Sequence, residues 1–183
     1  PFGALNDLIF ADNGDIYFTD PGESGLENPT GRVFRLRTSG ELDLLMGGLA
    51  YPNGLVLDRS QEILYVALTR SQQVLRLPLR RNYGGVHKCG VFLQLSGGLA
   101  GPDGMAMDEA GSLFVAVSGL ATVWQFSPLG EPVTRFRSCA GIRTTNVAFG
   151  GEGRKTLYIT EAEHGVILEA NTSAAGRQMY SHF

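Results

Sequence analysis

The strongest constraint on the fold is a short pattern that recurs four times along the chain. In each copy, a side chain that carries an oxygen stands just before a short apolar segment, and these anchor residues are Asn6, Asn53, Asp103 and Asn146. The intervals between successive anchors are 47, 50 and 43 residues. Repeats of this length are typical of propeller blades and of other repeat arrays. The sequence lacks long helical periodicity, so strands are expected to build the repeats.

Each repeat divides into four short segments with the character of β-strands. Residues 33–37 and 74–77 alternate apolar and polar side chains, as half-buried strands do, and Asp12-Asn13-Gly14-Asp15 has the chemistry of a hairpin turn. The predicted strands are 8–11, 16–19, 32–36 and 42–45; 55–58, 63–68, 74–79 and 91–95; 105–108, 113–117, 123–126 and 133–136; and 147–149, 156–160, 166–169 and 178–181.

This pattern predicts an all-β chain, a β-propeller with four recognisable four-stranded antiparallel blades. We expect a single domain over residues 1–183, with repeats at about 5–46, 52–96, 102–138 and 145–183. The loop at 21–31 is longer than its equivalents, which suits either a functional loop or a solvated insertion.

The local chemistry of the anchors predicts turns. In Gly101-Pro102-Asp103-Gly104, proline fixes φ and the following glycine permits a sharp bend, and Tyr51-Pro52-Asn53-Gly54 has the same form. We therefore expect each anchor in a turn before an innermost strand, so that all anchors point toward one axis. Asparagine and aspartate also favour turns without any function, which is the alternative interpretation.

Composition limits the classes of partner. The chain has a net charge of −3, so nothing in its charge favours nucleic acid or an anionic membrane. The sequence shows neither a signal-peptide pattern nor an apolar run near the ~20 residues that span a bilayer. We expect a cytoplasmic protein, with the periplasm as the alternative. Cys89 and Cys139 lack metal-ligand spacing, and we expect two reduced, buried thiols, with a disulfide as the other option.

Four motifs together point to a known family. Asn6-Asp7-Leu8, Tyr51-Pro52-Asn53-Gly54-Leu55, Gly101-Pro102-Asp103-Gly104-Met105 and Thr145-Asn146-Val147-Ala148-Phe149 occur in this order. Jointly they resemble the SMP-30/gluconolactonase/luciferin-regenerating-enzyme family from Asn6 to about Tyr180. The resemblance implies a six-bladed propeller that hydrolyses lactones or related esters. It also implies a divalent cation at the mouth of the central channel, calcium first, with zinc, manganese or magnesium as alternatives.

The resemblance also assigns roles to residues. Asn53 and Asp103 match two metal ligands of the family, and Asn6 matches a residue that binds metal or substrate. Asp103 also matches the residue proposed as general base or nucleophile. Asp7 is expected to support Asn6 and, with Asn6 and Asn146, to contact the substrate. Amide and carboxylate oxygens are the ligands that hard cations prefer, and such a cation can polarise a carbonyl and acidify a bound water.

The chain departs from the family pattern in three ways. The family has six blades, whereas four repeats are found here. The family also takes a glutamate metal ligand from its first blade, which has no counterpart among these repeats. In addition, Ala4 stands where many members have an arginine. Four blades at the family's angle would expose apolar faces at both ends, which implies a missing N-terminal part, self-association or a tighter closure. We therefore expect a metal-dependent lactone or ester hydrolase, with a catalytically incomplete binding or assembly module as the alternative.

Three further polar residues have less specific patterns. His164 follows a second strand in the fourth repeat, which would place it near the channel mouth, although a single histidine on a loop is usually only solvated. Thr19 and Asp20 end a predicted strand, and capping of that strand end is the simpler interpretation.

Overall fold

The chain consists almost entirely of short antiparallel strands. The computed structural model describes residues 1–80, 85–97 and 99–182. In this part of the chain, fifteen strands form four sheets, which we number as blades 1 to 4, and two 3-10 helices of three residues each complete the regular structure.

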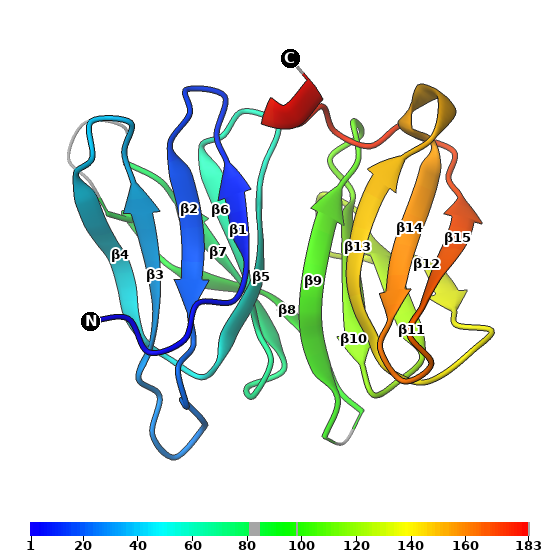
Figure 1. The fold of residues 1–183 in the computed structure, drawn as a ribbon, viewed down its shortest axis with the longest axis horizontal. Coiled ribbons are helices and arrows are strands. Elements are labelled where there is room, and N and C mark those ends of the chain that lie inside the picture. Colours follow the sequence, from blue (N-terminus) through cyan, green and yellow to red (C-terminus); the bar gives the residue numbers. More distant parts are fainter. Residues whose placement is uncertain (81–84, 98, 183) are drawn as a thin grey trace.

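The strands follow one another across each blade in chain order, from the innermost to the outermost (Figure 1). Their bounds are β1 (Leu8–Phe10), β2 (Ile16–Asp20), β3 (Gly31–Leu36) and β4 (Leu42–Leu49) in blade 1; β5 (Pro52–Leu57), β6 (Ile63–Leu68), β7 (Gln73–Pro78) and β8 (Gly90–Gln94) in blade 2; β9 (Gly101–Met107), β10 (Leu113–Ser118), β11 (Thr122–Phe126) and β12 (Pro132–Arg137) in blade 3; and β13 (Thr144–Gly150), β14 (Thr156–Glu161) and β15 (Val166–Asn171) in blade 4.

The first strands of the blades lie next to one another around a common axis. Strand β5 contacts both β1 and β9, and β9 contacts β13. Buried side chains fill the spaces between blades: one cluster, which includes Ile9, Leu55 and Met105, joins blades 1 to 3, and a second, which includes Phe114 and Val147, joins blades 3 and 4. This arrangement confirms the prediction of an all-β chain with radially placed antiparallel sheets.

Blade 4 differs from the prediction, because it has three strands. The strand predicted at 178–181 is wrong: this segment ends in a 3-10 helix, η2 (Tyr180–His182). The chain before it turns back, so that Gly176 pairs with Asp108 and the Arg177 N–H donates to the Met107 carbonyl oxygen at 2.8 Å. The backbone groups of the C-terminal segment thus find partners beside β9 instead of on the free edge of β15, and Figure 1 shows the segment crossing between the blades.

Three of the four anchors, Asn53, Asp103 and Asn146, lie inside strands, so the prediction of turns is wrong for them, whereas Asn6 precedes β1 as expected. Strands β5, β9 and β13 begin before Asn53, Asp103 and Asn146, and the register with the second strand shifts at each of these points. Proline is tolerated there because the innermost strand is a sheet edge. The extra residue makes a β-bulge, which bends the strand and redirects the side chain beside it.

Two glycines let the innermost strands approach closely. A Cβ atom at Gly54 would overlap the carbonyl oxygen of Asp103, and one at Gly104 would overlap the side-chain oxygen of Asn146. The glycine after each anchor therefore makes room for the anchor of the next blade. This close approach brings Asn53, Asp103 and Asn146 to one end of the axis.

The two end faces of the array are exposed but differ in chemistry. On the outer face of blade 1, Leu8 (55% exposed) and Leu44 (56%) lie in one cross-strand row with Phe18 and Phe34, and Phe2 packs edge-on against both rings. The outer face of blade 4 is mostly polar, with rows that contain Asn146, Thr160 and Ile167, and Ala148, Tyr158 and Glu169. The expectation of apolar faces at both ends is correct for blade 1 and wrong for blade 4, and these two faces do not bury each other.

Two further expectations concern the cysteines and membranes. Cys89 and Cys139 are free thiols and both are exposed, so the prediction of buried thiols is wrong. They lie just before β8 and just after β12, at outer strands whose ends meet solvent.

Among the residues that the structure describes, none of the helices has the length and apolar character needed to cross a membrane.

Candidate functional site

Four predicted site residues gather where the innermost strands begin. Asp7 directly precedes β1, Asn53 is the second residue of β5, and Asp103 and Asn146 are each the third residue of their strands. In Figure 1 the strands β1, β9 and β13 run upward, so this end of the axis lies at the lower side of the view. We call it the channel mouth.

Asp103 is the centre of this group. Its side chain is half-buried and accepts hydrogen bonds from the Asn53 side chain and the Gly104 N–H. Burial is the main cause that raises the pKa of Asp103 to about 7, and the nearby negative charge of Asp7 raises it further against the effect of these hydrogen bonds. A carboxyl group in such surroundings favours either a proton or a cation.

Asp7 brings a second carboxylate from the neighbouring blade. Burial also raises its pKa, while hydrogen bonds from the N–H groups of Leu8 (2.8 Å) and Leu55 (3.3 Å) act to lower it. The bond to Leu55 ties the start of blade 1 to β5. Asp7 and Asp103 therefore place two carboxyl groups at the channel mouth.

Asn53 is buried and held by hydrogen bonds to two threonines. It is 7% exposed, its side-chain Nδ2 donates to Thr69 Oγ1 at 3.1 Å, and its backbone carbonyl oxygen accepts from Thr19 Oγ1 at 2.8 Å. Thr69 Oγ1 in turn donates to the Pro102 carbonyl oxygen at 2.8 Å. Thr69 is not predicted as a site residue from the sequence, although its position directly after β6 indicates that it lies at this end of the fold.

Asn6 and Asn146 lie at the edge of the group. Asn6 is exposed, and its backbone N–H donates to the Thr19 carbonyl oxygen at 3.1 Å. Asn146 is exposed too, and its Oδ1 accepts from the Val147 N–H at 2.8 Å while it packs against Gly104. The structure thus links Asn53 directly to Asp103, and it links Asp7 to Asn53 through the Thr19 hydroxyl. Asn146 lies beside Gly104, and Asn6 is one residue before Asp7 and open to solvent.

A cavity of about 320 Å³ extends along the axis from this group. Asp7 and Asn146 line it, together with apolar side chains such as Ile9 and Met105, and the C-terminal residues Arg177, Met179 and His182 line it as well. An apolar wall with a few polar groups is the usual form of a small-molecule site.

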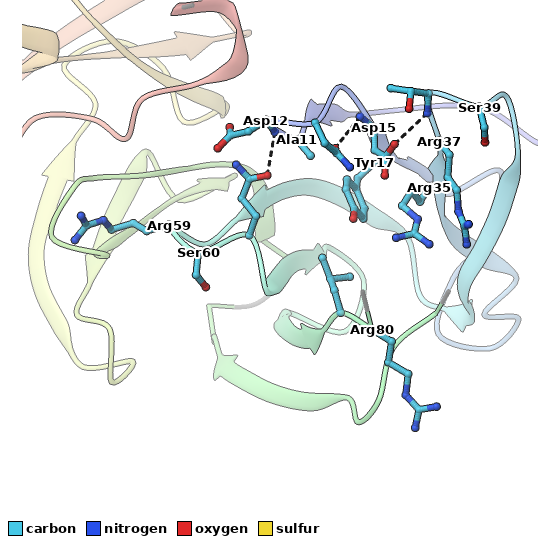
Figure 2. Close-up of a pocket in the computed structure, with 14 residues that line it drawn as sticks. Ala11, Asp12, Asp15, Tyr17, Arg35, Arg37, Ser39, Arg59, Ser60 and Arg80 are labelled. Atoms are coloured by element: carbon cyan, nitrogen blue, oxygen red, sulfur yellow. Dashed lines mark hydrogen bonds between the residues drawn. The ribbon is translucent and has the colours of Figure 1, made fainter. Parts of the chain in front are cut away.

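A larger cavity, of about 620 Å³, lies away from the anchors, between blades 1 and 2 (Figure 2). Arginines line it, but Arg35 and Arg37 are both paired with Asp43, at 2.7 and 2.8 Å. Arg59 and Arg80 extend away from Arg35 and Arg37 in Figure 2, so the guanidinium groups do not converge on one point. We therefore place the candidate site at the channel mouth.

His164 belongs to a turn, together with Glu161. The Glu161 carboxylate is 1% exposed and accepts the N–H groups of Arg143, Glu163 and His164 and a bond from His164 Nδ1 at 3.1 Å. Burial acts to raise its pKa, but these hydrogen bonds together hold the pKa at about 2. The atoms of Glu161, Glu163 and His164 are close enough to suit a metal ion, yet the Glu161 oxygens already serve to close the turn between β14 and β15.

Asp20 also has a structural role. Its carboxylate accepts the N–H groups of Gly3 and Ala4, at 2.9 and 2.8 Å, and pairs with Arg32 at 2.5 Å. It holds the N-terminal segment against the end of β2, as expected for a residue that caps a strand end.

Comparison with known proteins extends these observations. A gluconolactonase from Zymomonas mobilis is 36% identical over an alignment of 185 positions, gaps included, which covers 91% of this chain and 50% of the relative. A pentonolactonase, XacC, from Haloferax volcanii is 30% identical over 158 residues, which cover 86% of this chain and 53% of the relative. The chain spans about half the length of both relatives.

The fold is that of a solved propeller-type structure, regucalcin from Agrobacterium tumefaciens, a calcium-binding protein. The TM-score is 0.83 at 23% identity, over 96% of this chain and 63% of that one. This likeness confirms the propeller-type fold, with part of the blades present in this chain. The model of the SMP-30/Gluconolactonase/LRE-like region matches residues 2–163. This chain therefore belongs to the SMP-30/gluconolactonase/LRE-like family.

Proposed function

We propose that this chain carries the hydrolytic centre of an enzyme that opens lactones or related esters. The observation that carries the proposal is the half-buried Asp103, hydrogen-bonded to Asn53 and close to Asp7, a residue that lines the apolar cavity. The names of the two lactonase relatives support the substrate class.

The donor set fits a divalent cation. Asp103 and Asn53 offer a carboxylate and an amide oxygen, Asn6 adds a second amide, and Asp7 adds negative charge, which is the chemistry that calcium prefers. Zinc, manganese and magnesium are the alternatives. The mutual repulsion of Asp7 and Asp103 is a cost that a cation at this place would remove. When bound, such an ion supplies carbonyl polarisation and a more acidic water.

The protein side chains have separate tasks in this proposal. Asp103 accepts a proton from the attacking water, the task of a positioned carboxylate in general base catalysis. Bound positive charge would lower its pKa and keep it ionised. Asn6, Asp7 and Asn146 orient the substrate, and the apolar wall of the cavity limits the access of other water molecules.

The test measures hydrolysis of a panel of sugar lactones and aryl esters by the chain, with and without added calcium. Proton release serves as the readout. We expect activity that EDTA removes and that Asp103→Asn lowers by at least about a hundredfold, the usual effect of losing a general base. Glu152→Gln, an exposed acid in the 3-10 helix η1 (Glu152–Arg154), is the matched control. Equal activity in wild type and Asp103→Asn would reject the assignment.

A second candidate function is an assembly module, and the exposed apolar face of blade 1 favours it. Two copies that join their blade 1 faces would cover Leu8, Leu42 and Leu44, in an interface above ~1,000 Å² in total. Light scattering at micromolar concentration should then show a dimer that Leu44→Lys dissociates, whereas Thr160→Lys on the polar face of blade 4 leaves it intact. A wild-type monomer would reject this candidate.

A further inference from the structure

Thr69 joins the two residues that the proposed function places at the cation. Its hydroxyl donates to the carbonyl oxygen of Pro102, the residue before Asp103, at 2.8 Å. The same oxygen accepts from the Asn53 side-chain Nδ2 at 3.1 Å. One hydroxyl thus links the Asn53 side chain in blade 2 to the backbone beside Asp103 in blade 3.

The direction of these bonds decides how the Asn53 amide is turned. A threonine hydroxyl has one hydrogen, and Pro102 offers an oxygen that can only accept. The hydroxyl hydrogen therefore goes to Pro102, and the hydroxyl can meet Asn53 only as an acceptor. That requires the amide nitrogen of Asn53 on the side of Thr69, and the amide oxygen points the other way.

The second hydrogen of the amide agrees with this orientation. Asn53 also hydrogen-bonds to Asp103, and an ionised carboxylate can only accept, so this bond takes the other amide hydrogen. Both amide hydrogens then face Thr69 and Asp103. The amide oxygen is left for another partner, and an amide oxygen is what a hard cation binds.

We propose that Thr69 is a positioning residue, which fixes the Asn53 amide so that its oxygen faces the channel mouth. This inference rests on the proposed function for the identity of the ligand, but the orientation itself stands on the two hydrogen bonds. Without the hydroxyl, the amide can turn over and present its nitrogen instead. The site would then keep its residues and lose the geometry of one ligand.

Thr144 shows what a purely structural threonine looks like in this fold. It is 1% exposed, and its hydroxyl oxygen lies 3.3 and 3.0 Å from the carbonyl oxygens of Val117 and Thr122, either of which can accept its one hydrogen. It links blades 3 and 4 through backbone atoms alone. Thr144→Val therefore matches Thr69→Val in the loss of one inter-blade hydroxyl and does not change the partners of any anchor side chain.

The first test follows the Asn53 side-chain amide by NMR in ¹⁵N-labelled protein without added metal, with the signal assigned from its loss in Asn53→Asp. Thr69→Val should speed exchange of the amide protons with solvent by about tenfold, the size of one net hydrogen bond. Thr69→Ser, which keeps the hydroxyl, and Thr144→Val should both stay within about twofold of wild type. Unchanged exchange in Thr69→Val would overturn the inference.

The second test is a calorimetric titration with calcium alone. We expect Thr69→Val to weaken binding by about 10- to 100-fold, as loss of a group that orients a metal ligand does, with Thr69→Ser and Thr144→Val close to wild type. Equal affinity in Thr69→Val and wild type would contradict the positioning role. Failure of wild type to bind calcium and to hydrolyse any lactone would count against the proposed function, and the NMR exchange would still decide the role of Thr69.

Discussion

Asp103 should make the fold less stable as the pH rises, when no cation is present. The pKa of its carboxyl group is raised from 3.8 to about 7 in the folded chain. Since the folded-state value lies above the unfolded one, the protonated form stabilises the folded state. This contribution is complete below pH 3.8 and is lost as the pH rises through about 7.

The size of the effect follows from the same two values. One pKa unit corresponds to about 1.4 kcal/mol, and integration between pH 5 and pH 8 gives a loss of about 2 to 3 kcal/mol in the free energy of unfolding. In Asp103→Asn the group does not titrate and this loss should disappear. The variant should therefore be more stable than wild type at pH 8 in EDTA, although it removes the centre of the proposed site.

Urea unfolding at pH 5 and pH 8 in EDTA measures this difference. The quantity to compare is the change in unfolding free energy between the two pH values, for wild type, Asp103→Asn and the exposed control Glu152→Gln. The control should follow wild type. If Asp103→Asn follows wild type as well, Asp103 is not strained by burial and by Asp7, and the electrostatic description of the site is wrong.

Two further predictions concern the scaffold. Gly54→Ala should destabilise the chain by about 1 to 3 kcal/mol in urea unfolding, because its Cβ would overlap the Asp103 carbonyl oxygen. The control Gly40→Ala, whose Cβ meets open space at a positive φ, should lose less stability, and an equal loss would contradict the close approach of β5 and β9. Glu161→Gln should lower the melting temperature at pH 7 and leave calcium affinity unchanged. The depressed pKa of Glu161 means that its ionised form stabilises the fold above about pH 4.5, and this stabilisation is lost as the pH falls toward 2. Loss of calcium binding in this variant would move the metal site to the β14–β15 turn.

The sequence predicted the strands well because their signals are local. Alternation along β3 and β7 and the turn residues 12–15 depend only on neighbouring side chains, and the repetition of Asn6, Asn53, Asp103 and Asn146 gave the order of the blades. The resemblance to the family rested on the same motifs. Local patterns are sufficient for this prediction because each blade is built from consecutive segments of the chain.

The errors came from contacts between distant segments. The motif at 101–104 has the composition of a turn, but pairing with β10 extends the strand through it and leaves a bulge. The strand predicted at 178–181 failed because the preceding residues, Gly176 and Arg177, find backbone partners beside β9. Thr69 could not be assigned, since the bond to Asn53 depends on how blades 2 and 3 approach each other.

We propose that Asn53 and Asp103 hold one divalent cation together at the channel mouth. Calorimetric titration of calcium into wild type, Asn53→Ala and Asp103→Asn tests it most directly. We expect both variants to bind more weakly than wild type, and Asp103→Asn to lose more, because it removes the anionic ligand of the pair. Equal calcium affinity in all three proteins would show that Asn53 and Asp103 are not ligands, and the proposed hydrolytic centre would lose its basis.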